Sequence, residues 1–122
     1  LSAKTIAVVG HSDKQYRTSY QIADYLRQVG YLIIPVNPSI STVNGDIGFP
    51  DLMSIGQKID IVNVFRRSEY LLEVVEQAHK INAGGVWSQL GVFDNESGKL
   101  ADQYAMNLVM NRCIMVEHRR LI

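Results

Sequence analysis

Residues 5–19 read T-I-A-V-V-G-H-S-D-K-Q-Y-R-T-S, and this stretch decides the fold. The short apolar run at 6–9 ends at Gly10, which is typical of a strand buried on both faces of a parallel sheet. In open α/β sheets the crevice beyond such a strand binds ligands, because the next helix points its unpaired N–H groups there. Gly10 permits a close approach, and Lys14 and Arg17 add positive charge. The loop therefore favours a phosphate group.

The rest of the chain alternates short apolar runs with helical patterns. We expect further strands at 32–36, 59–65, 85–90 and 108–110. Between them, the sequence predicts helices that start at Ser19, Ser68 and Asp94 and stop at Gly30, Gly84 and Asn107. Repeats of this kind need parallel pairing with right-handed crossovers. The predicted fold is α/β: a Rossmann-like, doubly wound parallel sheet of about five strands in a three-layer α/β/α sandwich.

Some details of these elements are predicted as well. The first helix is expected to carry Ile22, Leu26 and Val29 on one face. In the less regular segment 39–55, Asn44-Gly45 and Gly48 indicate turns, and Pro50-Asp51 is placed to start one helical turn through Ile55. The tail from residue 114 is amphipathic in composition, and its pattern predicts no particular form.

The composition is typical of a soluble globular protein. Twelve basic residues balance twelve acidic ones, which argues against nucleic acid or a membrane surface as a partner recognised through bulk charge. No apolar run approaches the roughly 20 residues that span a bilayer, and no leader pattern opens the chain. The single cysteine, Cys113, agrees with a reducing compartment. We therefore expect one domain over residues 1–122, located in the cytoplasm.

The crevice is predicted to gather the residues that follow each strand. These are 10–17, Asn37-Pro38, 65–67, 89–91 and 111–113. A dinucleotide fingerprint would need G-x-G-x-x-G after the first strand and an acidic residue about 20 positions later, and a Walker A loop would need G-x-x-x-x-G-K-[ST]. Neither pattern is present, so NAD and P-loop nucleotides are disfavoured.

Five motifs, taken in order, resemble a known family. They are V-V-G-x-S-D-K at 8–14, P-V-N-P at 35–38, I-V-N-V-F-R-R-S-E at 61–69, W-x-Q-L-G at 87–91 and N-R-C at 111–113. From residue 6 to about residue 121 the chain resembles the small, single-domain CoA-binding proteins, which are similar in turn to the N-terminal CoA-binding domain of the succinyl-CoA synthetase alpha subunit. Two positions depart from that pattern: His11 stands where an apolar residue is expected, and Ser39-Ile40 lacks a lysine that synthetase subunits carry nearby.

The resemblance implies a set of site residues for coenzyme A. It implies that the phosphate end is held by Gly10, Ser12, Lys14, Gln15 and Arg17. It also implies that Val36, Asn37 and Pro38 line the nucleotide pocket, and that the pantetheine path is bordered by Phe65, Arg66, Gln89, Gly91, Asn111 and Cys113. Asp13 and Arg112 lie within the same motifs and are further candidates.

Simpler interpretations stand beside these assignments. Arg66 and Arg67 are adjacent and point opposite ways in an extended segment, so at most one is expected to reach a ligand. His11 lies in the site loop, where it could hydrogen-bond a phosphate. Trp87 lies within an apolar strand and is expected to pack in the core rather than stack on adenine. A lone cysteine such as Cys113 is usually an inert buried side chain, but its place after a strand also allows a mixed disulfide with the CoA thiol.

Three functions compete on this reading. The leading one is a non-catalytic module that binds CoA or an acyl-CoA, because the phosphorylated histidine of the synthetase relatives belongs to a second domain. An NAD(P)- or other nucleotide-dependent oxidoreductase or transferase is the second, and an interaction protein with a vestigial pocket is the third. A homo-oligomer or a larger enzyme partner is compatible with the first. No metal site is expected, because His11, His79 and His118 lack ligand spacing.

Overall fold

The structure is a computed structural model that describes residues 4–43 and 45–121, with side chains described as far as residue 117. The main sheet has five parallel strands in the order β2-β1-β5-β6-β7. They are β1 Thr5–Val9, β2 Leu32–Val36, β5 Ile61–Val64, β6 Gly85–Ser88 and β7 Asn107–Val109. The predicted strands are confirmed, with small differences at their ends.

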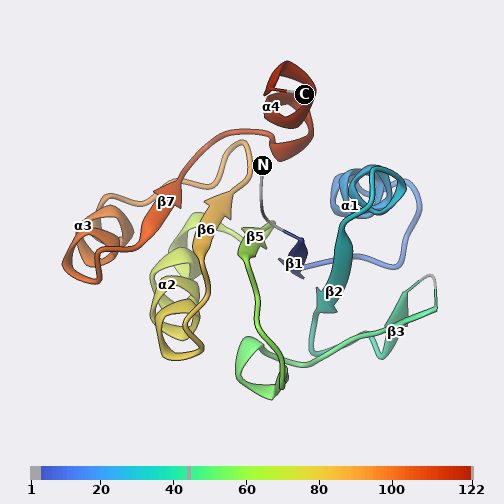
Figure 1. Cartoon of the computed structure of the whole chain (residues 1–122), viewed down its shortest axis with the longest axis horizontal. Helices are drawn as coiled ribbons and strands as arrows, with labels where there is room; N and C mark the ends of the chain where they lie inside the picture. The colour runs from blue at the N-terminus through green and yellow to red at the C-terminus, as the bar shows by residue number, and fades with distance from the viewer. Residues whose placement is uncertain (1–3, 44, 122) are drawn as a thin grey trace.

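Helices cover both faces of this sheet (Figure 1). On one face lie α1 Thr18–Gln28 and α4 Ile114–Leu121, and on the other lie α2 Leu71–Lys80 and α3 Asn95–Gln103. This is the predicted Rossmann-like α/β/α sandwich. The tail, for which the sequence predicted no form, is the helix α4. Among the described residues, no helix combines the length and the apolar character needed to cross a membrane.

Strand β1 lies inside the sheet and pairs on both sides. Val9, its last residue, lies opposite Val36 of β2 and Val64 of β5 in parallel register. After β1 the chain passes through α1 to β2, on one side of β1, and after β2 it crosses to β5, on the other side. Such a reversal of strand order opens a crevice at the carboxyl ends of the strands involved.

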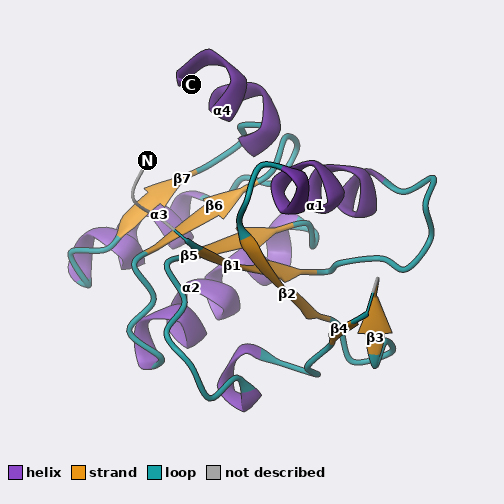
Figure 2. Ribbon diagram, turned by 45° about the vertical axis from the view of Figure 1, so that its right-hand side comes forward, coloured by secondary structure: helices purple, strands orange, loops and turns teal. Residues whose placement is uncertain are grey.

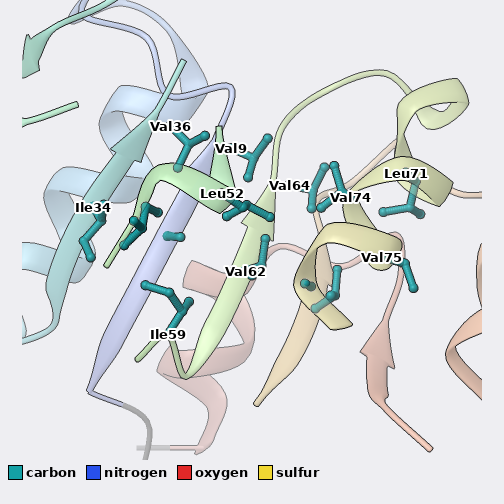
Figure 3. Close-up of a cluster of buried hydrophobic side chains, with 14 of the residues drawn as sticks. Val9, Ile34, Val36, Leu52, Ile59, Val62, Val64, Leu71, Val74 and Val75 are labelled. Atoms are coloured by element: carbon teal, nitrogen blue, oxygen red, sulfur yellow. The ribbon is translucent and has the colours of Figure 1, made fainter. Parts of the chain in front are cut away.

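The larger apolar cluster packs the sheet against α2. Val62 and Val64 of β5 are fully buried and belong to this cluster together with Leu71 and Val75 of α2 (Figure 3). Leu52, from the short 3₁₀ turn η1 Leu52–Ser54, closes the same cluster. Burial of apolar side chains is the main favourable term in folding, at about 25 cal/mol per Å² removed from water.

The smaller apolar cluster lies on the opposite face. It joins Val8 of β1 to Leu26 of α1 and Ile114 of α4. Asn63 of β5 is fully buried and lies opposite Val8 and Trp87 in the sheet register. Among the described residues, neither amide atom of Asn63 has a hydrogen-bond partner.

The first helix differs from the prediction at its start. It begins at Thr18, and its N-cap Arg17 makes no side-chain capping bond. Ser19 was predicted to be the cap, but it is the second helical residue and is buried. Val29 was placed on one helix face with Ile22 and Leu26, but it lies just beyond the last helical residue and is 44% exposed, whereas the other two are buried. Gly30, with φ +105°, is the predicted stop.

Two predicted stop residues are also wrong. After α2 the left-handed residue is Asn82, with φ 56°, rather than Gly84. Gly84 is needed for another reason, because a Cβ there would lie 2.5 Å from the Asp60 carbonyl oxygen. After α3 the left-handed residue is Ala105, with φ 53°, and Asn107 begins β7.

Of the two other helix caps predicted from the sequence, one is confirmed and one is not. Asp94 accepts a hydrogen bond from the Ser97 N–H at 2.9 Å and caps α3 as predicted. Ser68 was predicted to cap α2, but it opens a 3₁₀ turn, η2 Ser68–Tyr70, that leads into α2. Its hydroxyl instead bonds the loop after β6, accepting from the Phe93 N–H at 2.8 Å.

Residues 39–55 contain a small hairpin that the sequence did not predict. It pairs β3 Thr42–Val43 with β4 Asp46–Ile47 and lies at the β2 edge of the main sheet (Figure 2). Of the predicted turn, Gly45 has φ +83°, and Asn44 lies outside the described residues. Asp51 caps the predicted helical turn, η1, by accepting from the Ser54 N–H at 2.9 Å.

Candidate functional site

The first loop, residues 10–17, leaves the carboxyl end of β1 in a tight bend. Gly10 has φ +87°, and its N–H donates to the Val36 carbonyl at 2.8 Å. A Cβ on Gly10 would lie 3.3 Å from Arg66 Cγ and 3.4 Å from the Phe65 carbonyl carbon. Glycine is therefore favoured here both by the backbone conformation and by the close approach of the chain that follows β5.

Hydrogen bonds fix the shape of the first loop and join it to α1. The Ser12 N–H donates to Ser19 Oγ at 3.0 Å, which explains why Ser19 is not a cap. The Lys14 N–H donates to Ser12 Oγ, and the Arg17 N–H donates to the Lys14 carbonyl, both at 3.0 Å. These three amides are used inside the protein. Contact with an anion therefore falls to the loop side chains and to the first turn of α1.

A cavity of about 570 Å³, the loop cavity, lies between the first loop and the ends of β2 and β5. Thr18 and Ser19, in the first turn of α1, line it together with the exposed side chains of Lys14 and Arg17. The predicted site residues that line it are Gly10, Ser12, Asp13, Lys14, Arg17, Asn37 and Phe65. Two cations beside one carboxylate, at a helix N-terminus, create a positive field of the kind that binds phosphate.

A second cavity, the side cavity of about 410 Å³, adjoins the first through Gly10 and Asn37. Predicted residues that line it are Gly10, Val36, Asn37, Pro38 and Arg66. The Arg66 guanidinium lies 4.0 Å from the centre of the Tyr70 ring. The neighbouring Arg67 is 83% exposed at its side chain and lies 3.8 Å from a Glu69 oxygen. Only one of the two arginines therefore faces a cavity, in line with the extended backbone that separates them.

A third cavity, the apolar cavity of about 520 Å³, lies between α1 and the start of α4. It adjoins the loop cavity through Thr18 and Phe65. Of the predicted residues, Phe65, Gln89 and Cys113 line it, and Ile22, Val92 and Met115 make most of its wall apolar. The Cys113 side chain is buried.

Four predicted residues lie outside these three cavities: Gln15, Gly91, Asn111 and Arg112. The last three stabilise the ends of β6 and β7, where the Gly91 N–H donates to Asn111 Oδ1 at 2.8 Å. The Arg112 carbonyl accepts from Trp87 Nε1 at 2.8 Å, and the Trp87 ring packs against the smaller apolar cluster, as expected. The structure therefore gives Gly91, Asn111 and Arg112 local bonding roles.

The histidines fall into different environments. His11 is fully buried beneath the first loop and lines none of the three cavities, so its predicted contact with a phosphate is not supported. His79 lies on the surface of α2 and stacks on Tyr104, with ring centres 3.7 Å apart. In the part of the chain that the structure describes, no group of three His, Cys, Asp or Glu side chains is arranged to hold a metal ion.

Comparison with known protein families decides what kind of domain this is. The model of the CoA-binding domain family matches residues 4–119. The chain belongs to this family. The resemblance seen in the five sequence motifs is thereby confirmed.

Individual relatives of this CoA-binding domain agree in sequence and in fold. The YneT protein of Bacillus subtilis is 40% identical over 116 residues, which are 95% of this chain and 86% of YneT. A hypothetical protein from Pyrococcus horikoshii is 39% identical with a TM-score of 0.95, over 98% of this chain and 84% of that one. A dinucleotide-forming acetyl-coenzyme A synthetase from Ca. Korarchaeum cryptofilum shares the fold, with a TM-score of 0.74 at 21% identity, over 86% of this chain and 25% of that one.

Several cavity residues of the CoA-binding domain were missed by sequence reasoning. Thr18 and Ser19 line the loop cavity because they occupy the first turn of α1, and correct placement of the helix start would have found them. Glu73 and Gln77 line the side cavity from α2, four residues apart on one helix face. Asp51 reaches the side cavity from η1, in the segment whose structure was predicted least well.

Proposed function

We propose that this CoA-binding domain holds CoA or an acyl-CoA at the carboxyl ends of its parallel strands, without catalysing a reaction on it. One observation carries the proposal: Lys14 and Arg17 line the same cavity as the first turn of α1. The phosphates of CoA need positive charge and N–H donors, and both are gathered there. The match over residues 4–119 to CoA-binding domains supports the choice of ligand.

The three adjoining cavities suggest a path for the ligand. We assign the phosphates to the loop cavity and the nucleotide to the side that carries Asn37, which lines both cavities, and Pro38, which lines the side cavity. The pantetheine arm then passes Phe65, which lines both the loop cavity and the apolar cavity. Its thiol end, or an attached acyl group, enters the apolar cavity near Cys113. An apolar lining suits such a group, because its burial removes apolar surface from water.

Calorimetric titration of the purified chain at moderate salt tests this function. CoA should bind more tightly than dephospho-CoA, which lacks the 3′-phosphate, and NAD should bind poorly. Tight NAD binding would favour the alternative of a nucleotide-dependent enzyme. Negligible heats for all three ligands would contradict the proposal and favour a vestigial pocket.

A second comparison tests the acyl end. CoA and a short-chain acyl-CoA differ only at the thiol, so a difference in their affinities reports the apolar cavity. If the acyl group enters that cavity, acyl-CoA should bind at least as tightly as CoA, and the substitution Ile22→Ser should weaken acyl-CoA more than CoA. The cytoplasmic location and a homo-oligomer or larger enzyme partner stay predictions from the sequence.

A further inference from the structure

His11 is the largest polar side chain that the fold buries next to the first loop. Its exposure is 0%, and its ring meets the Tyr20 ring edge-on at 6.1 Å between centres. Burial of an imidazole is favourable only when its two nitrogens are hydrogen-bonded. Nδ1 lies 2.7 Å from the Ser12 carbonyl oxygen, and Nε2 lies 3.1 Å from Arg27 Nη2. Both nitrogens therefore have partners.

The chemistry of the two partners fixes the protonation state of this ring. A carbonyl oxygen only accepts hydrogen bonds, so Nδ1 of His11 carries a hydrogen and donates to Ser12. A guanidinium only donates, so Nε2 carries a lone pair and accepts from Arg27. The ring is thus the neutral Nδ1–H tautomer. A second proton would place an Nε2–H group against the Arg27 guanidinium, where two donors and two positive charges oppose each other.

His11 connects the first loop to two other parts of the fold. Arg27 Nε donates to Asp46 Oδ2 of β4 at 2.8 Å, which extends the bonded chain from the loop through α1 to the β3–β4 hairpin. The His11 carbonyl accepts from Asn37 Nδ2 at 3.2 Å, at the end of β2. The His11 ring therefore attaches the start of the loop to α1, and the His11 backbone carbonyl attaches it to the end of β2.

The charges around His11 come from three elements. Arg27 lies on α1, Asp46 on β4 and Asp13 on the first loop itself. Burial lowers the pKa of the His11 imidazole below its usual value. The Arg27 guanidinium lowers this pKa further, whereas the bond to the Ser12 carbonyl and the two carboxylates act in the opposite direction. The net effect favours the neutral ring in the folded protein.

We propose that His11 is a positioning residue for the first loop, and that its neutral ring must bridge Ser12 and Arg27 for the loop to hold the phosphates of CoA. The proposal rests on the proposed function for its effect on affinity, but the role of the ring in the loop does not depend on any ligand. Protonation would break the bond to Arg27, because Nε2 would then carry a hydrogen that faces a donor, whereas Nδ1 would keep its bond to the Ser12 carbonyl. The ring would then no longer attach Ser12, which lines the loop cavity, to α1. The loop would then lose the conformation that directs Lys14 and Arg17 into that cavity.

The first test is made on the full chain without ligand. Imidazole ¹⁵N shifts at neutral pH should show His11 as the Nδ1–H tautomer, and amides 12–17 should lose protection from hydrogen exchange as the pH falls from 7.5 to 5.0. The variant His11→Asn does not titrate and keeps an N–H donor for the Ser12 carbonyl, so its loop protection should change little over this range. A His11 ring that is charged at pH 7, or equal pH dependence in both proteins, would overturn the proposal.

The second test measures CoA affinity at pH 7.5 and pH 5.0, with near-ultraviolet circular dichroism to confirm folding at each pH. The wild type should lose about three- to tenfold more affinity than His11→Asn. Titration of the CoA phosphates affects both proteins equally, so it cancels in this ratio. His79→Gln, which removes an exposed histidine on α2, should behave as the wild type. An equal loss in the wild type and His11→Asn would contradict the positioning role, whereas failure of every protein to bind CoA at pH 7.5 would contradict the proposed function alone.

If His11→Asn fails to fold, His11→Gln provides the comparison, since its amide reaches toward the position of Nε2. It should also remove the pH dependence of loop protection. The free energy of unfolding of the wild type should also fall with the pH, because His11 contributes to it. Because the folded His11 pKa is lowered, its contribution is complete above the unfolded value of about 6.5 and is lost as the pH falls below it.

Discussion

The Ser12 N–H donates a 3.0 Å hydrogen bond to the hydroxyl of Ser19, the second residue of α1. This bond joins the first loop to the helix whose first turn faces the loop cavity. Ser12 Oγ in turn accepts from the Lys14 N–H. The position of one cationic side chain of the site therefore depends on a buried hydroxyl that the sequence pattern assigned to helix capping.

Ser19→Ala should loosen the loop without breaking α1. The substitution leaves the Ser12 N–H without its partner, so we expect a loss of about 1 kcal/mol in the free energy of unfolding and about a fivefold loss in CoA affinity. Urea unfolding and calorimetry measure the two effects. Ser97→Ala removes another buried hydroxyl in the first turn of a helix, α3, outside the three cavities, and should leave CoA affinity unchanged. Equal affinities in Ser19→Ala and the wild type would show that this bond does not shape the site.

Gly10→Ala should affect both stability and binding. The left-handed conformation costs a non-glycine residue about 1–2 kcal/mol, and the new Cβ would press on Arg66 Cγ and the Phe65 carbonyl carbon. Gly45→Ala is a matched control, since its φ of +83° imposes similar strain while no atom lies within 4 Å of a Cβ there. Both variants should be less stable than the wild type, but only Gly10→Ala should lose CoA affinity.

Lys14→Ala and Arg17→Ala should each weaken CoA binding about tenfold, because each removes a hydrogen bond to a charged group worth about 1.5 kcal/mol or more. The loss should shrink at high salt, where the interaction of these exposed cations is screened. Arg67→Ala and Lys80→Ala are the controls, because each removes one positive charge outside the three cavities. A similar loss in the controls would mean that net charge, rather than the loop, attracts the ligand.

Cys113 should form a mixed disulfide with CoA. The Cys113 thiolate attacks one sulfur of CoA disulfide, a new S–S bond forms, and one CoA thiolate leaves. Mass spectrometry should show one CoA moiety added to the wild type and none added to Cys113→Ser, which has no other cysteine. Glutathione disulfide at the same concentration should react more slowly, because the loop cavity does not direct it to the apolar cavity. Absence of a CoA adduct on Cys113 would remove the assignment of the thiol end.

Asn63→Leu should stabilise the protein. The Asn63 amide is fully buried in β5 without a hydrogen-bond partner among the described residues, and such a group costs about 1–3 kcal/mol. A side chain of similar volume without polar atoms removes that cost, so the urea midpoint should rise while CoA affinity stays the same. A lower midpoint would show that the amide is paired in solution. Asn107→Leu, at an exposed position that begins β7, serves as the control for a change of polarity alone.

The sequence alone determined the chain order of the five strands of the main sheet and of α1, α2 and α3, together with the loop that carries the site. The apolar runs at 6–9 and 32–36 are each followed closely by glycine or proline, which indicates buried strands. This signal is local in the sequence, so it does not depend on which segments pack against the strands. The strand that ends at Gly10 fixes where the crevice opens, because parallel strands share a carboxyl edge. For this reason Lys14 and Arg17 could be assigned to a cavity before any contact was known, and both line it.

The tertiary structure alone decided how side chains divide between the cavity and the core. His11 and Lys14 lie in the same loop, yet one is fully buried and the other is exposed, because the fold brings Arg27 and the β3–β4 hairpin beneath His11. Gly84 looked like a helix stop, but it is required by the approach of the Asp60 carbonyl, 24 residues earlier in the chain. Hydrogen bonds and close contacts between distant segments leave no periodic signal in the sequence, so only the folded chain shows them.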